Sequence, residues 1–342
     1  MIKASWKKLT LDFKIPSGTS RGILTQKDSW IISIWNTNNS SIIGIGEASI
    51  IKTLSPEWDD NFETKVNTIC ETIEKHITSE GLKKLSQYPS LQLAIETALL
   101  DLKNGGKSIL FPSDFVSKQS PIPINGLIWM GDKAFMKTQI ETKLKEGFKC
   151  IKLKIGAIDF ETELQILKDI RSNYSATDIE LRVDANGAFT PSEALDKLNE
   201  LSKFDLHSIE QPIKAGQINE MARLCSNTPF PIALDEELIG VSKLENKRDL
   251  LTQINPQYII LKPSLIGGFK GTDEWIKLAE QQNIKWWITS ALESNIGLNA
   301  IAQYTFIQNN PLPQGLGTGG LFTNNTPCNL NVINGELILN SK

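Results

Sequence analysis

Hydrophobic and polar residues alternate along the first fifty positions of the chain. Apolar residues occupy every second position over 9–15, and two further apolar runs, 30–35 and 42–45, are separated by the polar stretch 36–41. A period of two is typical of a strand with one buried face, and a short polar break between two such runs marks a turn. The pattern predicts a three-stranded antiparallel meander.

The period changes after residue 60. Apolar residues recur every three or four positions over 62–77 and again over 91–102, where Gly105 and Gly106 end the second run. This spacing is typical of amphipathic helices. Strands followed by helices favour an α+β domain, which we place at residues 1–120.

From residue 121 onward one design recurs: an apolar run ends in a charged residue, and a loop and a helix-like segment follow. Five of these runs end in Lys154, Asp184, Glu210, Asp235 and Lys262. The charged residues follow one another at intervals of 30, 26, 25 and 27 positions, which suits one strand, one helix and two short loops. The repeat predicts a (β/α) barrel.

Three further runs complete the expected barrel. Strands are predicted at 123–127, 284–289 and 314–317, which gives eight strand–helix units within residues 121–322. Residues 329–339 alternate again, and the tail, 323–342, is expected to return to the N-terminal sheet. The predicted fold is α/β: a modified TIM (β/α) barrel with an N-terminal α+β capping domain that the C-terminal tail completes.

Composition and charge exclude several classes of protein. The 342 residues include 36 Lys and Arg against 39 Asp and Glu, and no basic block is long enough to indicate nucleic-acid binding. No apolar stretch approaches the ~20 residues of a membrane helix, and the N-terminus lacks the apolar region of a signal peptide. The four cysteines form no Cys-x-x-Cys pair. We expect a cytoplasmic enzyme without nucleic-acid or membrane partners; the pattern favours no particular oligomeric state.

Three of the charged strand ends are acids. The strand ends of a barrel meet at one face, so Asp184, Glu210 and Asp235 are expected to lie together as oxygen ligands of a cation. Such ligands favour Mg²⁺, with Mn²⁺ as the other option. A three-histidine zinc site is impossible because the chain has only His76 and His207. One acidic strand end alone is usually a loop cap, but three in successive units favour a cation site.

The lysines are expected to surround these acids. Lys152 and Lys154 are two apart on one strand and therefore point to one face, either into the barrel or outward between the helices; we favour the interior. Lys262 belongs to the sixth strand, opposite the second, so Lys154 and Lys262 are expected to face each other across a substrate. Arg182 shares the inward face of Asp184 and either neutralises the acids or has a structural role.

These residues resemble the enolase superfamily and, within it, the muconate-lactonising-enzyme subgroup. The similarity rests on Lys152-Leu153-Lys154 as a K-x-K motif, Asp184-Ala185-Asn186, Glu210-Gln211-Pro212 and Asp235-Glu236 as metal segments, Lys262-Pro263 as the opposing lysine, and Gly44-Ile45-Gly46-Glu47-Ala48 as the G-x-G-E-A segment of the capping domain. It implies a magnesium enzyme that removes a proton next to a carboxylate and passes through an ene-diolate. Lys154 would be the base, and Lys262 would stabilise the intermediate.

Three segments narrow the resemblance to one family of the subgroup. Residues 313–319, 290–297 and 19–22 are similar to segments of the o-succinylbenzoate synthases. Dipeptide epimerases of the subgroup usually carry an Asp-x-Asp on strand eight, whereas residues 315–322 contain no acid. The resemblance implies loss of water from 2-succinyl-6-hydroxy-2,4-cyclohexadiene-1-carboxylate, a small-molecule dicarboxylate, to give 2-succinylbenzoate on the way to menaquinone.

Further residues are candidates for binding the substrate or supporting the catalytic groups. They are Lys152, Arg182, Asn186, Glu236, Ser290, Arg21, Gly315, Gly317 and Thr318. The glycines of the 315–320 run suit a phosphate-binding loop, a tight return to the sheet, or close approach of backbone amides to a substrate carboxylate. We favour the third because the implied substrate is a dicarboxylate.

Other functions fit the same residues. Two lysines on opposite faces would also serve an N-acylamino acid racemase or a dipeptide epimerase. A Schiff-base aldolase would need one lysine and leave the three carboxylates unexplained. A barrel that binds metabolites without catalysis is the alternative from another class, and the complete set of lysines and acids argues against it.

Overall fold

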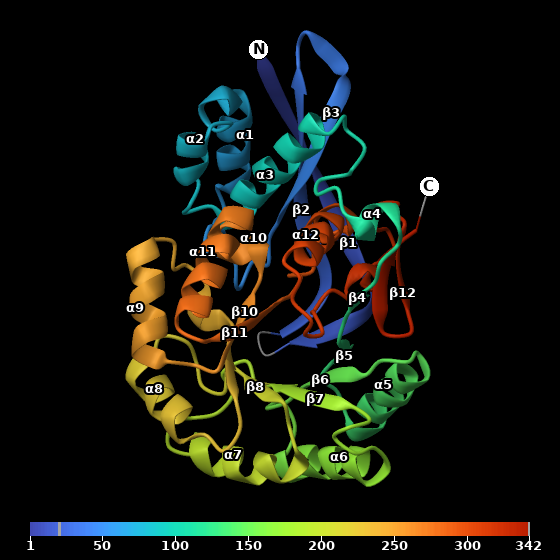
Figure 1. The fold of residues 1–342 in the computed structure, drawn as a ribbon, viewed down its shortest axis with the longest axis vertical. Helices are drawn as coiled ribbons and strands as arrows, with labels where there is room; N and C mark the ends of the chain where they lie inside the picture. The colour runs from blue at the N-terminus through green and yellow to red at the C-terminus, as the bar shows by residue number, and fades with distance from the viewer. Residues whose placement is uncertain (20–21, 341–342) are drawn as a thin grey trace.

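The computed structural model describes residues 1–19 and 22–340. Its strands form an antiparallel three-stranded sheet, a parallel seven-stranded sheet and a small sheet that includes the C-terminal hairpin. Figure 1 shows the N-terminal strands and helices at one end of the molecule and the repeating strand–helix units at the other. The predicted α/β barrel with an N-terminal α+β unit is confirmed. Over the described residues, no helix combines the length and apolarity that a membrane span requires.

The N-terminal unit contains the predicted meander. Strands β1 (Ile2–Thr19), β2 (Gly22–Asn36) and β3 (Asn39–Ser49) pair antiparallel in that order. The helices that follow are α1 (Phe62–Glu71), η1 (Ile73–Lys75), α2 (Ser79–Lys83) and α3 (Pro89–Lys103). The first predicted helix, 62–77, is therefore too long, because its last part tightens into the 3₁₀ turn η1. Buried residues of β2, α1 and α3 form a core of their own.

Helix α3 lies directly on β3 because two glycines leave room for its backbone. A Cβ on Gly44 would lie 1.9 Å from the Ala98 carbonyl oxygen, and one on Gly46 would lie 1.9 Å from that of Ala94. Any side chain at either position would force the helix away from the sheet. Glu47 comes next on the strand and points to the opposite face of the sheet.

A buried carboxylate in the loop before α1, which binds the start of α3, makes the stability of this unit depend on pH. Glu57 is 4 % exposed and accepts a hydrogen bond from the Ser90 N–H at 2.7 Å, and burial raises its pKa to about 7. The folded protein thus holds this proton up to a higher pH than the unfolded chain, so stability falls as pH rises between about 4.5 and 7.

Glu57→Gln should remove this dependence, because the amide oxygen still accepts from Ser90 and the side chain no longer ionises. Between pH 5 and pH 8, the free energy of unfolding of the original protein should fall by roughly 2–3 kcal/mol more than that of the variant. Urea unfolding at each pH measures the difference. Glu80→Gln, at an exposed position on α2, is the control and should follow the original profile; parallel profiles for Glu57→Gln would contradict the prediction.

The barrel strands are parallel and adjacent in the order of the sequence, β5 to β11. They are β5 (Gly126–Ile128), β6 (Cys150–Lys154), β7 (Glu180–Asp184), β8 (Ser208–Glu210), β9 (Ile232–Leu234), β10 (Tyr258–Leu261) and β11 (Lys285–Ile288). The helical segments that follow these strands are α5 (Lys133–Lys145), α6 (Phe160–Asn173), α7 (Ala194–Leu201), η2 (Ser202–Phe204), α8 (Ile218–Asn227), η3 (Glu236–Leu238), α9 (Leu244–Ile254), α10 (Pro263–Ile266), α11 (Gly268–Gln281) and α12 (Asn295–Ile307). In Figure 1 the helices lie along the outside of the curled sheet.

The eighth strand is reduced to two paired residues that close the barrel. Gln314 bridges Ile124 and Gly315 bridges Thr289, both in parallel orientation. The Gln314 N–H donates to the Pro123 carbonyl oxygen at 2.8 Å, and the Gly315 N–H donates to the Ile288 carbonyl oxygen at 2.8 Å. The predicted strand at 314–317 is thus shorter than expected. The chain turns at residues 317–318 and continues into a 3₁₀ turn, so the ladder does not extend beyond Gly315.

The C-terminal tail returns to the N-terminal sheet at its start, where the Thr323 N–H donates to the Asp12 carbonyl oxygen of β1 at 2.9 Å, but its hairpin pairs elsewhere. Phe322 bridges Phe13 of β1, and η4 (Gly319–Leu321) precedes it, but the hairpin of β12 (Leu330–Ile333) and β13 (Glu336–Leu339) pairs with β4 (Ile122–Pro123). The predicted first barrel strand, 123–127, is divided between β4 and β5, which leaves β4 free to accept this hairpin. The helix α4 (Asp114–Ser117) precedes β4. The division into a capping domain, 1–120, and a barrel domain, 121–322, stays a prediction.

Candidate active site

The five charged strand ends lie at the same end of the sheet. Lys154, Asp184 and Glu210 are the last residues of β6, β7 and β8, and Asp235 and Lys262 directly follow β9 and β10. The strand register pairs Lys154 with Asp184 and Asp184 with Glu210. Short strands of parallel register therefore place these side chains beside one another.

The two lysines of β6 point into the barrel, as we favoured. The Lys152 Nζ donates to the Asp184 Oδ2 at 3.0 Å and to the Glu210 Oε2 at 2.5 Å. The Lys154 Nζ donates to the Asp184 Oδ2 at 3.1 Å and to the Asn186 Oδ1 at 2.6 Å. The reading in which the pair extends outward between the helices is wrong. Asp184 thus has an ammonium group of each lysine as a partner.

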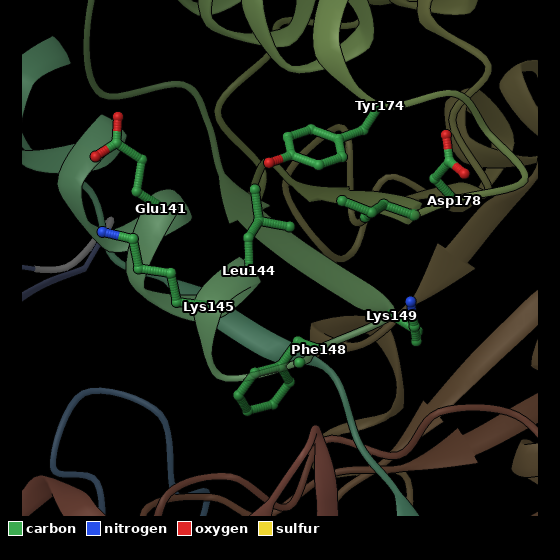
Figure 2. A pocket seen from close by; sticks show the side chains of 9 residues that line it. Glu141, Leu144, Lys145, Phe148, Lys149, Tyr174 and Asp178 are labelled. Atoms are coloured by element: carbon green, nitrogen blue, oxygen red, sulfur yellow. The ribbon is translucent and has the colours of Figure 1, made fainter.

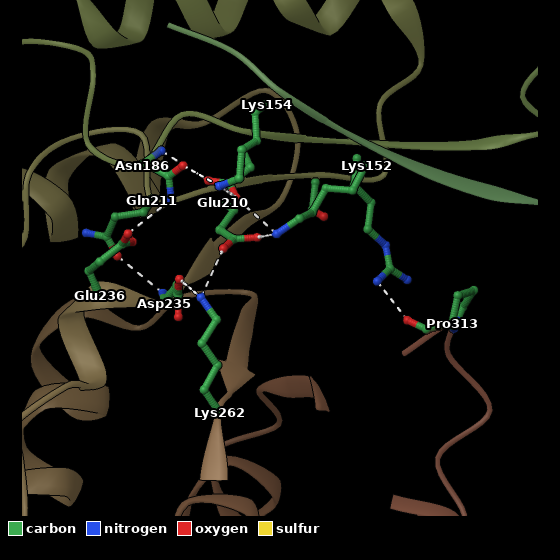
Figure 3. Close-up of polar contacts among 12 residues, drawn as sticks. Lys152, Lys154, Asn186, Glu210, Gln211, Asp235, Glu236, Lys262 and Pro313 are labelled. Carbon is green, nitrogen blue, oxygen red and sulfur yellow. Dashed lines mark hydrogen bonds and ion pairs between the residues drawn. The ribbon is translucent and has the colours of Figure 1, made fainter. Parts of the chain in front are cut away.

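Lys262 reaches the same carboxylates from the other side. Its Nζ forms an ion pair with Asp235 and lies 3.9 Å from the Glu210 Oε1. Figure 3 shows Lys154 and Lys262 extending from opposite sides toward Glu210 and Asp235, which lie between them. A molecule bound over the acids would therefore have an ammonium group on each side.

The electrostatics of this cluster are uneven. Burial raises the pKa of Asp184, but the charges of Lys152, Lys154 and Lys262 outweigh it and hold that pKa well below its usual range. Burial and the charge of Asp184 raise the pKa of Glu210 well above its usual value. Burial lowers the pKa values of Lys152 and Lys262, and the neighbouring acids outweigh it, so both are raised. Negative charge at Glu210 is thus incompletely compensated.

The donor set fits a hard divalent cation. Asp184, Glu210 and Asp235 offer only oxygen atoms and are almost fully buried, and among the described residues the Glu210 Oε1 is a buried oxygen with no hydrogen bond. Oxygen ligands and an uncompensated buried charge suit Mg²⁺. In the described ranges, no group of three His, Cys, Asp or Glu side chains has the spacing of a metal site. At the strand ends the reason is that lysine ammonium groups lie between the carboxylates.

Two left-handed residues just beyond the strand ends support the acids. Asn186 has a φ of 44° and Gln211 a φ of 40°. The Asn186 Nδ2 donates to the Glu236 Oε1 at 3.0 Å, while the Gln211 Oε1 accepts from the Asp235 N–H at 3.2 Å and its Nε2 donates to the Glu237 Oε2 at 3.0 Å. Gln211 was not among the predicted site residues. The pattern that located the site, a charge at each strand end, carries no signal for a neutral amide.

A cavity of about 660 Å³ opens in front of the cluster. Its polar lining includes Lys152, Lys154, Asp184, Asn186, Glu236, Lys262, Ser290, Gly315, Gly317 and Thr318. Its apolar lining includes Ile15, Ile23, Leu24, Ile51, Leu54, Trp129, Leu292 and Leu321. Residues of the N-terminal unit and of the barrel thus enclose one space, charged at its base and apolar over the rest, as suits a hydrocarbon ring that bears carboxylates.

Arg182 does not join the cluster. Its Nε donates to the Glu180 Oε1 at 2.7 Å and its Nη1 to the Pro313 carbonyl oxygen at 2.9 Å, and the guanidinium lies 4.3 Å from the centre of the Trp287 ring. Arg182 therefore has a structural role and does not neutralise the acids of the cluster. Arg21 lies outside the described residues.

Packing rather than ligand contact accounts for one glycine of the strand-eight run. A Cβ on Gly315 would lie 2.4 Å from the Thr289 Oγ1, so only glycine lets this segment approach Thr289, directly after β11. Gly317 differs, because its Cβ would meet atoms no closer than 3.6 Å. Packing thus explains Gly315 without a bound carboxylate. Close approach of a backbone amide to a substrate carboxylate stays a prediction at Gly317.

A second hollow lies at the opposite end of the strands. Figure 2 shows this pocket of about 410 Å³ and the side chains of Leu144, Lys145, Phe148, Lys149 and Tyr174 around it. Lys149 directly precedes β6, so the pocket is at the N-terminal end of that strand. It contains none of the charged strand ends. The chemistry is therefore expected at the other face.

Comparison with known proteins agrees with this arrangement. Residues 136–338 match the family model described as enolase C-terminal domain-like. The o-succinylbenzoate synthase of Desulfotalea psychrophila is 46% identical, over 98% of each chain. The crystal structure of MenC from the same organism superposes with a TM-score of 0.87 and 42% identity, covering 99% of both chains.

A more distant structure has the same fold. The dipeptide epimerase of Enterococcus faecalis, solved with Mg and the dipeptide L-Leu-L-Tyr, superposes with a TM-score of 0.85 at 21% identity, over 99% of this chain and 97% of the epimerase. Enzymes of this superfamily depend in general on Mg²⁺. The match of the barrel to the family model and the high identity over nearly the whole length together show that the chain belongs to the enolase superfamily, in the family that includes the o-succinylbenzoate synthases.

Proposed function

We propose that this enzyme dehydrates 2-succinyl-6-hydroxy-2,4-cyclohexadiene-1-carboxylate to 2-succinylbenzoate, in menaquinone biosynthesis. The observation that carries the proposal is the placement of Lys154 and Lys262 on opposite sides of the buried acids, at the base of a mostly apolar cavity. The identity with an o-succinylbenzoate synthase over 98% of both chains supports the choice of reaction.

Asp184, Glu210 and Asp235 would hold Mg²⁺, or Mn²⁺ in its place. The ion, when bound, supplies positive charge that stabilises the negative charge developing on the substrate carboxylate. The three acids come from adjacent strands and so lie side by side, and the lysine ammonium groups between them would move aside for the ion. Lys152 contacts two of these acids and would compensate part of their charge.

Lys154 would be the general base. Its neutral amine would accept the proton from the ring carbon that bears the carboxylate, and the electron pair of that C–H bond would form the ene-diolate. The Asn186 Oδ1, 2.6 Å from the Lys154 Nζ, would orient the amine. The electron pair would then return to the ring as the C–O bond breaks, and Lys154 would give its proton to the departing hydroxyl, which leaves as water.

Lys262 would stay protonated on the opposite side. Its ammonium group would stabilise the ene-diolate electrostatically, with a cation–π contribution once the ring is aromatic. The apolar lining, including Trp129 and Leu292, would keep water from the intermediate. Together these residues would stabilise the transition state more than the bound substrate.

The direct test follows the ultraviolet absorbance of the aromatic product. Purified enzyme with Mg²⁺ should convert the cyclohexadiene substrate to 2-succinylbenzoate, and heat-denatured enzyme should not. The same preparation is incubated with N-succinylamino acids in D₂O to measure deuterium at the α-carbon. Deuterium exchange without aromatisation would overturn the dehydration and favour the racemase.

A further inference from the structure

A second buried polar cluster lies behind the cavity wall and joins the N-terminal unit to the barrel. Strands β2 and β3 contribute Lys27, Ser29 and Glu47, and the loop after β11 contributes Glu293 and Ser294, each at most 5 % exposed. None of these five residues belongs to the lysine and carboxylate cluster described above. Buried charges are costly, so this arrangement requires a specific set of partners.

Glu47 uses both carboxylate oxygens on the loop and the helix that follow β11. Its Oε1 accepts from the Ser29 Oγ at 2.6 Å and from the Ser294 N–H at 2.8 Å. Its Oε2 accepts from the Ser294 Oγ at 2.5 Å and from the Gly297 N–H at 2.9 Å. A carboxylate of the N-terminal unit thus binds the start of α12, where free N–H groups favour an anion.

Glu293 binds the other side of the same loop. Its Oε1 accepts from the Ser264 Oγ at 2.5 Å and its Oε2 from the Ala291 N–H at 2.6 Å. Ser264 lies two residues after Lys262, at the start of the short helix α10. The carboxylate therefore connects the cavity wall with the segment that carries the second lysine of the active site.

Between these two contacts lies a strained residue. Leu292 has a φ of 63° and is buried, and its side chain lines the cavity beside Ser290 and Ala291. A bulky residue other than glycine seldom adopts this conformation, which persists only where surrounding contacts enforce it. Glu293 fixes the N–H just before Leu292, and Glu47 fixes the N–H of Ser294, so the strained turn is held from both sides.

We propose that Glu293 and Glu47 are positioning residues for substrate binding: they hold the Ser290–Leu292 turn in the one conformation that completes the cavity wall. The idea rests on the proposed function, because it assumes that substrate occupies this cavity. Neither carboxylate lines the cavity itself, so each acts through the turn. Loosening the turn should weaken contacts that substrate and transition state share, which raises KM and leaves kcat nearly unchanged.

The test compares two substitutions at Glu293 in the full-length enzyme. Glu293→Gln keeps both hydrogen bonds, since the amide oxygen accepts from the Ala291 N–H and the amide NH₂ donates to the Ser264 hydroxyl; its KM should stay within about threefold of the original. Glu293→Leu removes both hydrogen bonds and should raise KM by about tenfold or more, with kcat within about threefold. Hydrogen exchange of the peptide around Ala291 should accelerate in the leucine variant alone.

Glu96→Leu is the matched control. Glu96 is also a buried carboxylate of the N-terminal unit, and it accepts from the barrel residue Phe269 at its N–H, 2.6 Å away, without reaching the turn. A general loss of stability should affect both leucine variants alike, whereas a positioning role raises KM only in Glu293→Leu. Equal KM changes in the two variants would overturn the proposal.

A second pair of variants tests the turn without removing a buried charge. Leu292→Ala shortens the side chain and keeps the strained backbone, while Leu292→Gly also releases the strain. Because glycine adopts the positive φ without strain, Leu292→Gly should hold the turn more easily, and its KM should be at least about threefold below that of Leu292→Ala. Equal values would count against the proposal. Failure of the original enzyme to aromatise the substrate would instead refute the function on which it rests.

Discussion

Replacing Lys154 by methionine is expected to lower kcat about a thousandfold, within the range of 10²–10⁴ that a positioned proton-transfer group contributes. Methionine matches the length of the lysine side chain but has no amine to accept the proton. Asp184 keeps the Lys152 ammonium at 3.0 Å as a partner, so the acid is not left without a counter-charge. Circular dichroism and the melting temperature should therefore show a folded protein. Ultraviolet turnover assays at saturating substrate measure the loss.

The control for this substitution is Lys145→Met. Lys145 is an exposed lysine of α5 at the far pocket (Figure 2), remote from the charged strand ends. Its replacement should leave kcat and KM unchanged. The assignment of the base would be wrong if Lys154→Met retained kcat within about tenfold of the original, since no proton-transfer group of ordinary strength is worth so little.

Removal of divalent cations should have an effect of similar size. After treatment with a chelator and dialysis, turnover should fall to roughly 1% or less, and adding Mg²⁺ should restore it, because charge stabilisation at the reacting carboxylate is worth several kcal/mol. Mn²⁺ should restore activity as well, since it also prefers oxygen ligands. A fully active enzyme that contains no divalent metal by elemental analysis would refute the site.

A measurement other than activity separates metal binding from catalysis. Mg²⁺ that binds only the folded state raises the melting temperature with concentration. This rise should be present in the original enzyme and in Lys154→Met, and absent in Asp235→Asn, which loses one of the three acids. An equal rise of the melting temperature in Asp235→Asn would show that Asp235 is not a ligand. The role of Lys154 as the base would be unaffected by that result.

The sequence predicted the charged cluster because one physical rule covers it: strands of a barrel end at the same face, so charges at successive strand ends must meet. Nothing comparable predicts Glu47, which contacts Ser294 across 247 positions of the chain. The direction of Arg182 was equally open, because an inward-facing residue can extend toward either end of the barrel. Local pattern thus identified charged residues but not the partners that distant segments supply.

The pairing of the tail shows the same limit. Alternation over 329–339 predicted strands correctly, but alternation does not specify an edge, and both the meander and β4 offered one. The structure pairs β13 with β4. Prediction of the last barrel strand failed in another way. The apolar positions around 314–317 did not reveal that the chain turns soon after Gly315, which limits the ladder to two residues.

The short closure of the barrel bears on how this family can change its substrate. Among the residues that the structure describes, only Gln314 and Gly315 join the last strand to its neighbours. The residues that follow carry little of the barrel's hydrogen bonding but still line the cavity through Gly317, Thr318 and Leu321. Leu316 and Phe322 are buried and fix the two ends of this segment, whereas substitutions at Thr318 and Leu321 would reshape the binding surface without breaking the ladder. The end of strand eight is therefore a place where selection, natural or in the laboratory, can explore new specificities while the lysines proposed for catalysis stay fixed.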